Sequence, residues 1–166
     1  MNWRVFVHLK PDLVDHHGEA VQKEIKRAKV KGVKKVRAGQ AYELSGELAQ
    51  SDVWRLAERL LSDPVTQEAA VFPEDLGKAP KGVRPIRRTG TAPSGGRLAE
   101  VWPRKGVTDP VADTVLLAAK DLGVKGLLSA RSGRVYDFFG KSSSADVKIF
   151  CEEHLMNPLV QSVEVM

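Results

Sequence analysis

Hydrophobic and polar positions alternate at the start of the chain, in the pattern of a half-buried β-strand. One face of this predicted strand carries Trp3, Val5, Val7 and Leu9, and the other carries Arg4, Phe6, His8 and Lys10. A helical pattern follows. Asp15 is a suitable N-cap for this helix, which places Val21, Ile25 and Ala28 on one side. The first 30 residues therefore predict a strand and then an amphipathic helix.

The next stretch predicts two strands, a second helix and a last strand. We expect Gly32 to end the first helix and a strand pair to be joined near Gly39. Ser51 or Asp52 caps the second helix, whose apolar stripe is Val53, Leu56, Ala57, Leu60 and Leu61. Pro64 stops this helix before the last strand. The predicted order of elements is β-α-β-β-α-β. In this order both helices bury their apolar stripes against one face of an antiparallel sheet, which is a ferredoxin-like arrangement.

The same pattern occurs twice. A shift of the sequence along itself aligns residues 5–72 with 99–166 without a gap, and roughly a quarter of the pairs are identical. Several identical pairs are residues that fix backbone geometry or aromatic packing: Gly32/Gly126, Gly39/Gly133, Tyr42/Tyr136, Gly46/Gly140 and Pro64/Pro158. Asp109 and Asp146 are the expected caps in the second copy. We predict an α+β fold of two ferredoxin-like repeats, residues 1–72 and 99–166, packed as a pseudo-dimer.

Residues 73–98 separate the two repeats. They hold six of the Lys and Arg residues against two Asp and Glu, together with four prolines and five glycines, and show no hydrophobic period. We interpret this segment as a basic linker. It accounts for most of the formal net charge of +5.

Composition narrows the function classes. No run of 18 apolar residues occurs and the amino terminus has no leader-like stretch, so we expect a cytoplasmic protein without a membrane span. Cys151 is the single cysteine and has no disulfide partner in the chain. With four scattered histidines, no metal site is expected.

Catalytic motifs are not found either. Cys151 falls on an apolar helical stripe, where a thiol is unactivated, and the adjacent His16 and His17 have no third ligand in view. No phosphate-binding loop or dinucleotide turn stands between a strand and a helix. We therefore expect no catalytic residue and no cofactor.

Two other classes remain open. Tyr136, Phe138 and Phe139 crowd one strand, as in sheets that stack RNA bases, although a core or subunit contact is the favoured interpretation. The second alternative is a small-molecule sensor with its ligand between the repeats. One run of lysines is interpreted as a solvated helix face: Lys23, Lys26, Lys29, Lys31, Lys34 and Lys35.

An ordered set of motifs resembles the PurS subunit of phosphoribosylformylglycinamidine synthase. In the first repeat these are Val5 to Pro11, Val14-Asp15, Gly18 to Val21, Val36 to Leu44 and Leu60 to Val65. The second repeat keeps a looser version in Gly106 to Pro110, Arg131 to Gly133, Tyr136 to Phe138 and Met156 to Val160. The lysine usual in that family after the motif glycine is Gln40 in one repeat and Arg134 in the other.

The resemblance implies a non-catalytic role. PurS-like proteins join an ATP-dependent synthetase (PurL-like) to a glutaminase (PurQ-like), so that ammonia from glutamine reaches formylglycinamide ribonucleotide in the fourth step of purine biosynthesis. Tethering two copies makes the second contact intramolecular, so we expect a monomeric chain. Six residues on the predicted strand pairs are candidates for the subunit interface: Arg37, Gly39, Tyr42, Arg131, Gly133 and Tyr136.

Overall fold

The computed structural model describes residues 2–74, 86–87 and 96–166. The first repeat comprises β1 (Asn2–Leu9), α1 (His16–Arg27), β2 (Val33–Gly46), α2 (Gln50–Leu56) with a final π turn η1 (Ala57–Leu61), and β3 (Gln67–Pro73). The second comprises β5 (Arg97–Pro103), α3 (Pro110–Asp121), β6 (Leu127–Gly140), α4 (Ser144–His154) and β7 (Gln161–Val165). A short strand, β4 (Ile86–Arg87), pairs with β3. Most of the predicted linker 73–98 lies outside the described residues.

The predicted strand pair in each repeat is in fact one long strand. β2 runs unbroken through Gly39 and β6 runs unbroken through Gly133. The hairpins expected at these glycines were therefore wrong. Neither glycine has a positive φ, so the backbone is not turned there. Each glycine instead makes room for a neighbouring strand: a Cβ on Gly39 would lie 2.7 Å from the His8 ring, and one on Gly133 would lie 2.7 Å from the Trp102 ring.

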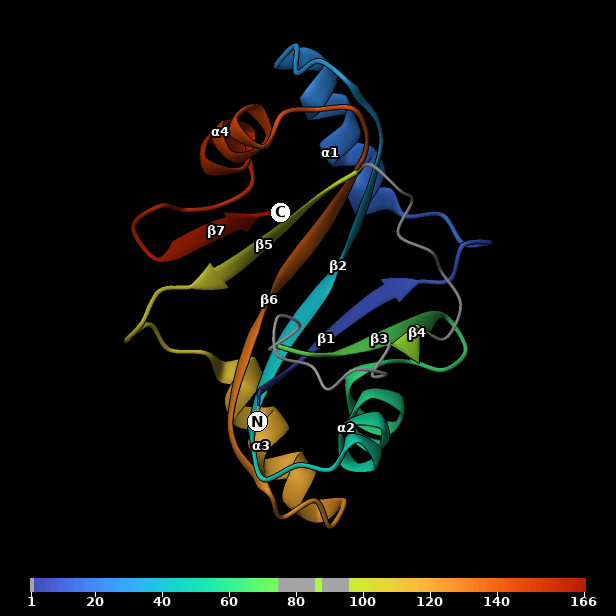
Figure 1. Cartoon of the computed structure of the whole chain (residues 1–166), viewed down its shortest axis with the longest axis vertical. Helices are drawn as coiled ribbons and strands as arrows, with labels where there is room; N and C mark the ends of the chain where they lie inside the picture. The colour runs from blue at the N-terminus through green and yellow to red at the C-terminus, as the bar shows by residue number, and fades with distance from the viewer. Residues whose placement is uncertain (1, 75–85, 88–95) are drawn as a thin grey trace, which may run out of the picture.

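The described strands form a single antiparallel sheet in the order β4-β3-β1-β2-β6-β5-β7. β2 and β6 pair with each other from Val33 opposite Gly140 to Gly46 opposite Leu127. The C-terminal half of β2 pairs with β1 on its other side, and the C-terminal half of β6 pairs with β5. The two long strands thus run the length of the molecule and join the repeats through backbone hydrogen bonds (Figure 1).

The helices pack in pairs drawn from both repeats. α2 and α3 lie together at one end of the molecule, and α1 and α4 lie together at the other (Figure 1). The first core contains β1, β3 and α2 from the first repeat, but also Val115 and Ala119 from α3. The second core contains β5, β6 and α4, but also Val21 and Ile25 from α1. Each hydrophobic core is therefore completed by a helix of the other repeat.

This exchange explains what was correct and what was wrong in the fold prediction. The α+β class and the pseudo-dimer of two repeats are confirmed. The order β-α-β-β-α-β exists in space, but its first helix and second strand come from the other repeat. An opened hairpin allows each strand to continue into the neighbouring repeat, and a covalent connection makes that exchange intramolecular.

Helix caps follow the sequence in α1 and α3 and differ in the other two. Asp15 and Asp109 are the N-caps of α1 and α3, as predicted, with Pro110 in the first turn of α3. α2 starts earlier than expected, after Ala49, and α4 starts after Ser143 instead of Asp146. In both cases the expected aspartate lies inside the first turn, where its charge still favours the helix dipole.

Gly32 and Gly126 were expected to end the first helix of each repeat, but both lie several residues beyond the helix end. α1 stops at Arg27 and α3 at Asp121. Gly32 comes close to the backbone at Gly140, and Gly126 comes close to the backbone at Glu47. Because these glycines have no side chain, the backbones of the two repeats can lie close together at both ends of the β2–β6 pair.

Candidate functional site

An aspartate fixes the loop between the first strand and the first helix of each repeat. Asp15 accepts hydrogen bonds from the backbone N–H groups of Gly18 (2.9 Å) and Ala38 (2.8 Å). Asp109 accepts the equivalent bonds from Ala112 (3.0 Å) and Ser132 (2.7 Å). Since one carboxylate holds both the helix and the long strand, the loop has a defined position in both repeats.

An arginine on the long strand holds the start of the same loop. Arg37 donates to the carbonyl oxygen of Leu9 at 2.9 Å, and Arg131 donates to that of Pro103 at 3.0 Å. Arg37 also pairs with Glu68 at 2.7 Å. Arg131 lies 5.2 Å from the Trp102 ring centroid and 3.5 Å from a Glu43 oxygen. The two arginines thus make the same backbone contact with different side-chain partners.

Each loop and its arginine form one wall of an open groove. The first groove, of about 500 Å³, includes residues 9–15, Glu19, Gln22 and residues 34–37. The second, of about 700 Å³, includes residues 103–109, Ala112, Asp113, Ala130 and Arg131. They occupy equivalent positions in the two repeats. The loops that form them lie on opposite sides of the molecule (Figure 1).

A second loop in each repeat is pinned beside the groove. Lys10 Nζ donates to the carbonyl oxygen of Pro64 at 2.8 Å, and Arg104 Nε donates to that of Pro158 at 2.9 Å. The turns at these prolines expose Val65 (76%) in the first repeat, and Leu159 (84%) and Val160 (40%) in the second. A side chain held out into water by an ordered turn is suited to contact with another protein.

The six predicted interface residues separate into two groups. Arg37 and Arg131 line the two grooves, and Gly39 and Gly133 lie in the strands next to them. Tyr42 and Tyr136 are buried in the first and second core, respectively. Burial raises the pKa of both tyrosines. Their hydroxyls lie near Gln40 (2.9 Å) and His17 (3.5 Å), so they pack the repeats internally.

Sequence reasoning missed the residues that pin the second loop. The signal was present in the repeat, because Pro64/Pro158 and Gln67/Gln161 are identical pairs. The glutamine side chains accept hydrogen bonds from the backbone N–H of Asp63 and Asn157, at 2.9 Å in both repeats. The identical residues at these two pairs of positions thus reflect a turn that is repeated in both halves, and a single motif does not show this.

Sequence reasoning also missed an ion cluster on the sheet face away from the helices. Arg4 forms ion pairs with Glu100, with Glu74 at 3.3 Å and with Glu43 at 3.7 Å. Glu100 is 1% exposed and also accepts a hydrogen bond from the Trp102 indole at 2.9 Å. The cluster joins β1 to β5 across the two repeats, so it contributes to their fixed relative position.

Cys151 and the aromatic residues of β6 were the other candidates for chemistry or ligand binding, and most of them are buried. Burial raises the pKa of the Cys151 thiol to about 12, with a smaller effect from Glu152. Tyr136 and Phe138 are buried core residues, as the sequence favoured.

Within residues 2–74, 86–87 and 96–166, no group of three or more His, Cys, Asp or Glu side chains is placed to hold a metal ion. In the same residues, no helix is long and apolar enough to cross a membrane.

The fold and its paired grooves define a tandem α+β scaffold, in which two repeats share interlocked cores and present equivalent surfaces on opposite sides. A family model, PurS: phosphoribosylformylglycinamidine (FGAM) synthase, matches residues 2–74 and 99–166. The chain belongs to this family, and the model matches each repeat separately. The resemblance inferred from the motifs is thereby confirmed.

Solved PurS structures are similar to less than half of this chain. The PurS subunit of formylglycinamide ribonucleotide amidotransferase from Methanocaldococcus jannaschii is 21% identical, covers 43% of this chain and 92% of its own, and has a TM-score of 0.38. B. subtilis PurS is 28% identical, with 43% and 94% covered and a TM-score of 0.38. The purS subunit from Thermotoga maritima is 26% identical, with 43% and 87% covered and a TM-score of 0.31. No curated protein matches the chain.

Proposed function

We propose that this chain is a non-catalytic bridging subunit of FGAM synthase. It holds an ATP-dependent synthetase subunit (PurL-like) and a glutaminase subunit (PurQ-like) together, so that ammonia released from glutamine reaches the activated substrate. The observation that carries the proposal is the pair of equivalent grooves on opposite sides of one molecule. Membership of the PurS family supports the identity of the complex.

A bridge must keep its two docking surfaces at a fixed separation. Here each core contains side chains of both repeats, and β2 and β6 are hydrogen-bonded along their length. A change in the relative position of the repeats would break both cores at once. The chain therefore acts as a monomeric pseudo-dimer, in which covalent linkage allows the two surfaces to take different partners.

The groove chemistry suits protein contact. Leu13 and Val107 are exposed apolar residues in the two groove loops, at 40% and 37%, beside cations that already have partners. Apolar contact rimmed by charged groups is typical of transient subunit interfaces. Because Arg37 and Arg131 position these loops, each arginine affects one docking surface and not the other.

The test uses Arg37→Ala and Arg131→Ala in the full chain, with purified synthetase and glutaminase subunits. We expect each single variant to weaken binding to one enzyme subunit by about tenfold, because its loop loses one anchoring hydrogen bond. The double variant should weaken binding to both subunits. Lys125→Ala is the control, because Lys125 is exposed and lines neither groove. Sedimentation velocity of the mixtures measures assembly.

Three results would contradict the proposal. The wild-type chain could fail to bind either enzyme subunit, both arginine variants could assemble normally, or the purified chain alone could turn over the substrate. The monomer is tested separately, since sedimentation equilibrium of the chain should give a mass near 18.2 kDa. An obligate dimer of the whole chain would overturn that part.

A further inference from the structure

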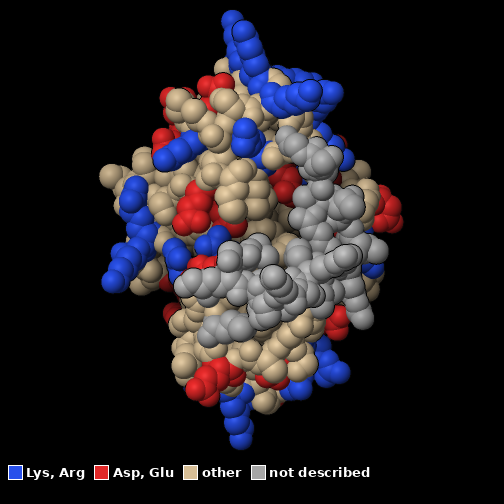
Figure 2. Space-filling view, in the orientation of Figure 1, with Lys and Arg blue, Asp and Glu red and all other residues tan. Residues whose placement is uncertain are grey.

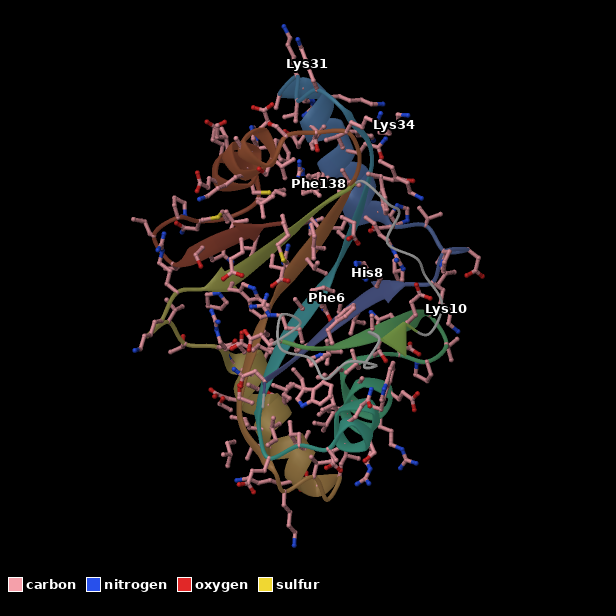
Figure 3. All side chains as sticks on the ribbon, viewed as in Figure 1. Phe6, His8, Lys10, Lys31, Lys34 and Phe138 are labelled. Carbon is pink, nitrogen blue, oxygen red and sulfur yellow. The ribbon has the colours of Figure 1, made fainter. Side chains whose placement is uncertain are left out.

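One end of the molecule is crowded with cations. Seven exposed residues lie on α1, on the turn that follows it and at the start of β2: Lys23, Lys26, Arg27, Lys29, Lys31, Lys34 and Lys35. Lys and Arg side chains gather over this end (Figure 2), and Lys31 and Lys34 extend away from the protein there (Figure 3). Arg27 pairs with Glu24 at 2.8 Å. The six lysines are in no ion pair identified among the described residues.

The second repeat shows that the fold does not need this charge. The equivalent positions are Leu117, Lys120, Asp121, Gly123, Lys125, Leu128 and Ser129. They follow the same helix and lead into the same long strand, yet only two are cationic. Cations near a helix C-terminus are favourable, but crowded like charges repel one another at the protein surface. The extra lysines therefore have a role outside folding.

A groove with an apolar floor opens beside these lysines. It has a volume of about 420 Å³ and lies between the end of α1 and α4. Ala28, Val30, Ile149 and Phe150 provide its apolar surface, and Ile149 is 52% exposed. Lys29 and Lys31 line the α1 side, whereas Asp146 and Glu153 line the α4 side. A ligand with an apolar group and acidic groups on one edge would match this surface.

We propose that the α1 end of the first repeat docks an acidic segment of a partner protein, with an apolar side chain of that segment in the groove between α1 and α4. The acidic residues of the segment face α1, because the α4 side repels them. The proposal rests on the bridging function above and adds the chemistry of one partner surface. A second copy of the chain does not fit, since its formal net charge of +5 would repel this basic end.

A protein segment fits better than a nucleic acid. Proteins that bind single strands combine basic grooves with accessible aromatic rings. At this end Tyr136, Phe138 and Phe150 are at most 2% exposed, and Phe139, which lies opposite Lys35, is partly buried. Among the described residues this leaves one partly covered ring, and base stacking along a strand needs several accessible ones. The half-exposed Ile149 is instead suited to an aliphatic or aromatic side chain from a protein. Because charge attracts the partner at long range, the association should depend on salt concentration.

The two repeats provide a matched pair of variants. Lys26→Gln/Lys31→Gln removes two charges at the proposed surface, and Lys120→Gln/Lys125→Gln removes the same number at the equivalent positions. Binding of each full-length variant to purified synthetase and glutaminase is measured by surface plasmon resonance across a salt series. We expect the first variant to bind one enzyme subunit about two- to thirtyfold more weakly at low salt, with a shallower salt dependence. The control should bind both subunits like the wild type.

Further measurements separate the alternatives. Ile149→Asp should weaken binding to the same enzyme subunit, and circular dichroism checks that its fold is intact. Equal effects of the two lysine pairs, or no effect of the first, would overturn the docking surface while leaving the bridging function standing. Lysine-dependent binding of a single-stranded RNA, or of phosphatidylserine vesicles, in place of either subunit would also overturn it. If the wild-type chain binds neither subunit, the bridging function itself fails.

Discussion

The equivalent strands β1 and β5 present different side chains on the sheet face away from the helices. β1 carries Arg4, Phe6 and His8 there, and β5 carries Leu98, Glu100 and Trp102 at the matching positions. The differences are complementary, because Arg4 pairs with the buried Glu100 of the other repeat. In a symmetric dimer each such contact would have to occur twice. Covalent linkage allows one repeat to hold the cation and the other the anion.

The helix-covered face shows the opposite behaviour. Leu44 and Phe138 occupy equivalent positions on the two long strands, and both are fully buried. Asp15 and Asp109 make the same two backbone contacts. The repeats therefore remain alike where they form the cores and the groove loops, and they differ where the two copies meet or face solvent.

The largest expected effect comes from a cavity in either core. Phe138→Ala should lower the free energy of unfolding by about 3–5 kcal/mol and Leu44→Ala by about 2–5 kcal/mol, through lost burial and the remaining cavity. Because each core includes a helix of the other repeat, both variants should shift one common transition in calorimetry. Two separated transitions would show that the cores unfold independently.

The next effect tests the ion pair between the repeats. Arg4→Leu should cost about 3–5 kcal/mol in unfolding free energy, since it leaves Glu100 buried without its cation. In the double variant Arg4→Leu/Glu100→Phe, each site carries the residue type found at its equivalent position in the other repeat. Leu98 is the equivalent of position 4, and Phe6 is the equivalent of position 100. This double variant should recover most of the loss in chemical denaturation. A double variant as unstable as the single one would contradict the account.

A smaller effect concerns the buried thiol, whose repeat equivalent is Ala57. The pKa of Cys151 is raised to about 12 from 9.0, so the unfolded chain loses its proton first as the pH rises. The stability due to the protonated thiol is complete below pH 9 and is lost as the pH approaches 12. Relative to Cys151→Ala, the wild type should lose about 1 kcal/mol by pH 10. A constant difference between the two proteins from pH 8 to pH 10 would contradict this.

The smallest effect concerns His17, whose equivalent is Val111. Its ring packs edge-on against Tyr136, with ring centroids 5.6 Å apart. Burial and then Arg134 lower its pKa below 6.5. The unfolded chain therefore binds the proton more readily, so stability falls as the pH drops below 6.5 through the lowered value. His17→Val should reduce this acid dependence slightly in thermal melts at pH 5 and pH 7, and an unchanged slope would count against it.

Local patterns predicted most of the helices and strands. The stripes identified the buried helix faces at Val21 and Ile25 in one repeat and at Val115 and Ala119 in the other. The stripe was wrong at Ala28, which is the C-cap of α1 and is exposed. The alignment of the repeats singled out Arg37 and Arg131, which line the two grooves, and their part in a subunit interface stays a prediction. Lys10 and Arg104 were not found, since a basic residue after a strand gives no local sign that it will bind a distant carbonyl oxygen.

The sequence by itself determined that a unit is duplicated, which segments form helices and strands, and which aspartates cap the first helices, because these depend on spacing and neighbouring residues. Only the tertiary structure decided that Gly39 and Gly133 lie inside continuous strands and that each core borrows a helix from the other repeat. A hairpin and an unbroken strand have the same alternation of side chains, and the choice between them depends on pairing with residues far along the chain. That pairing is a property of the whole fold, so no local pattern encodes it.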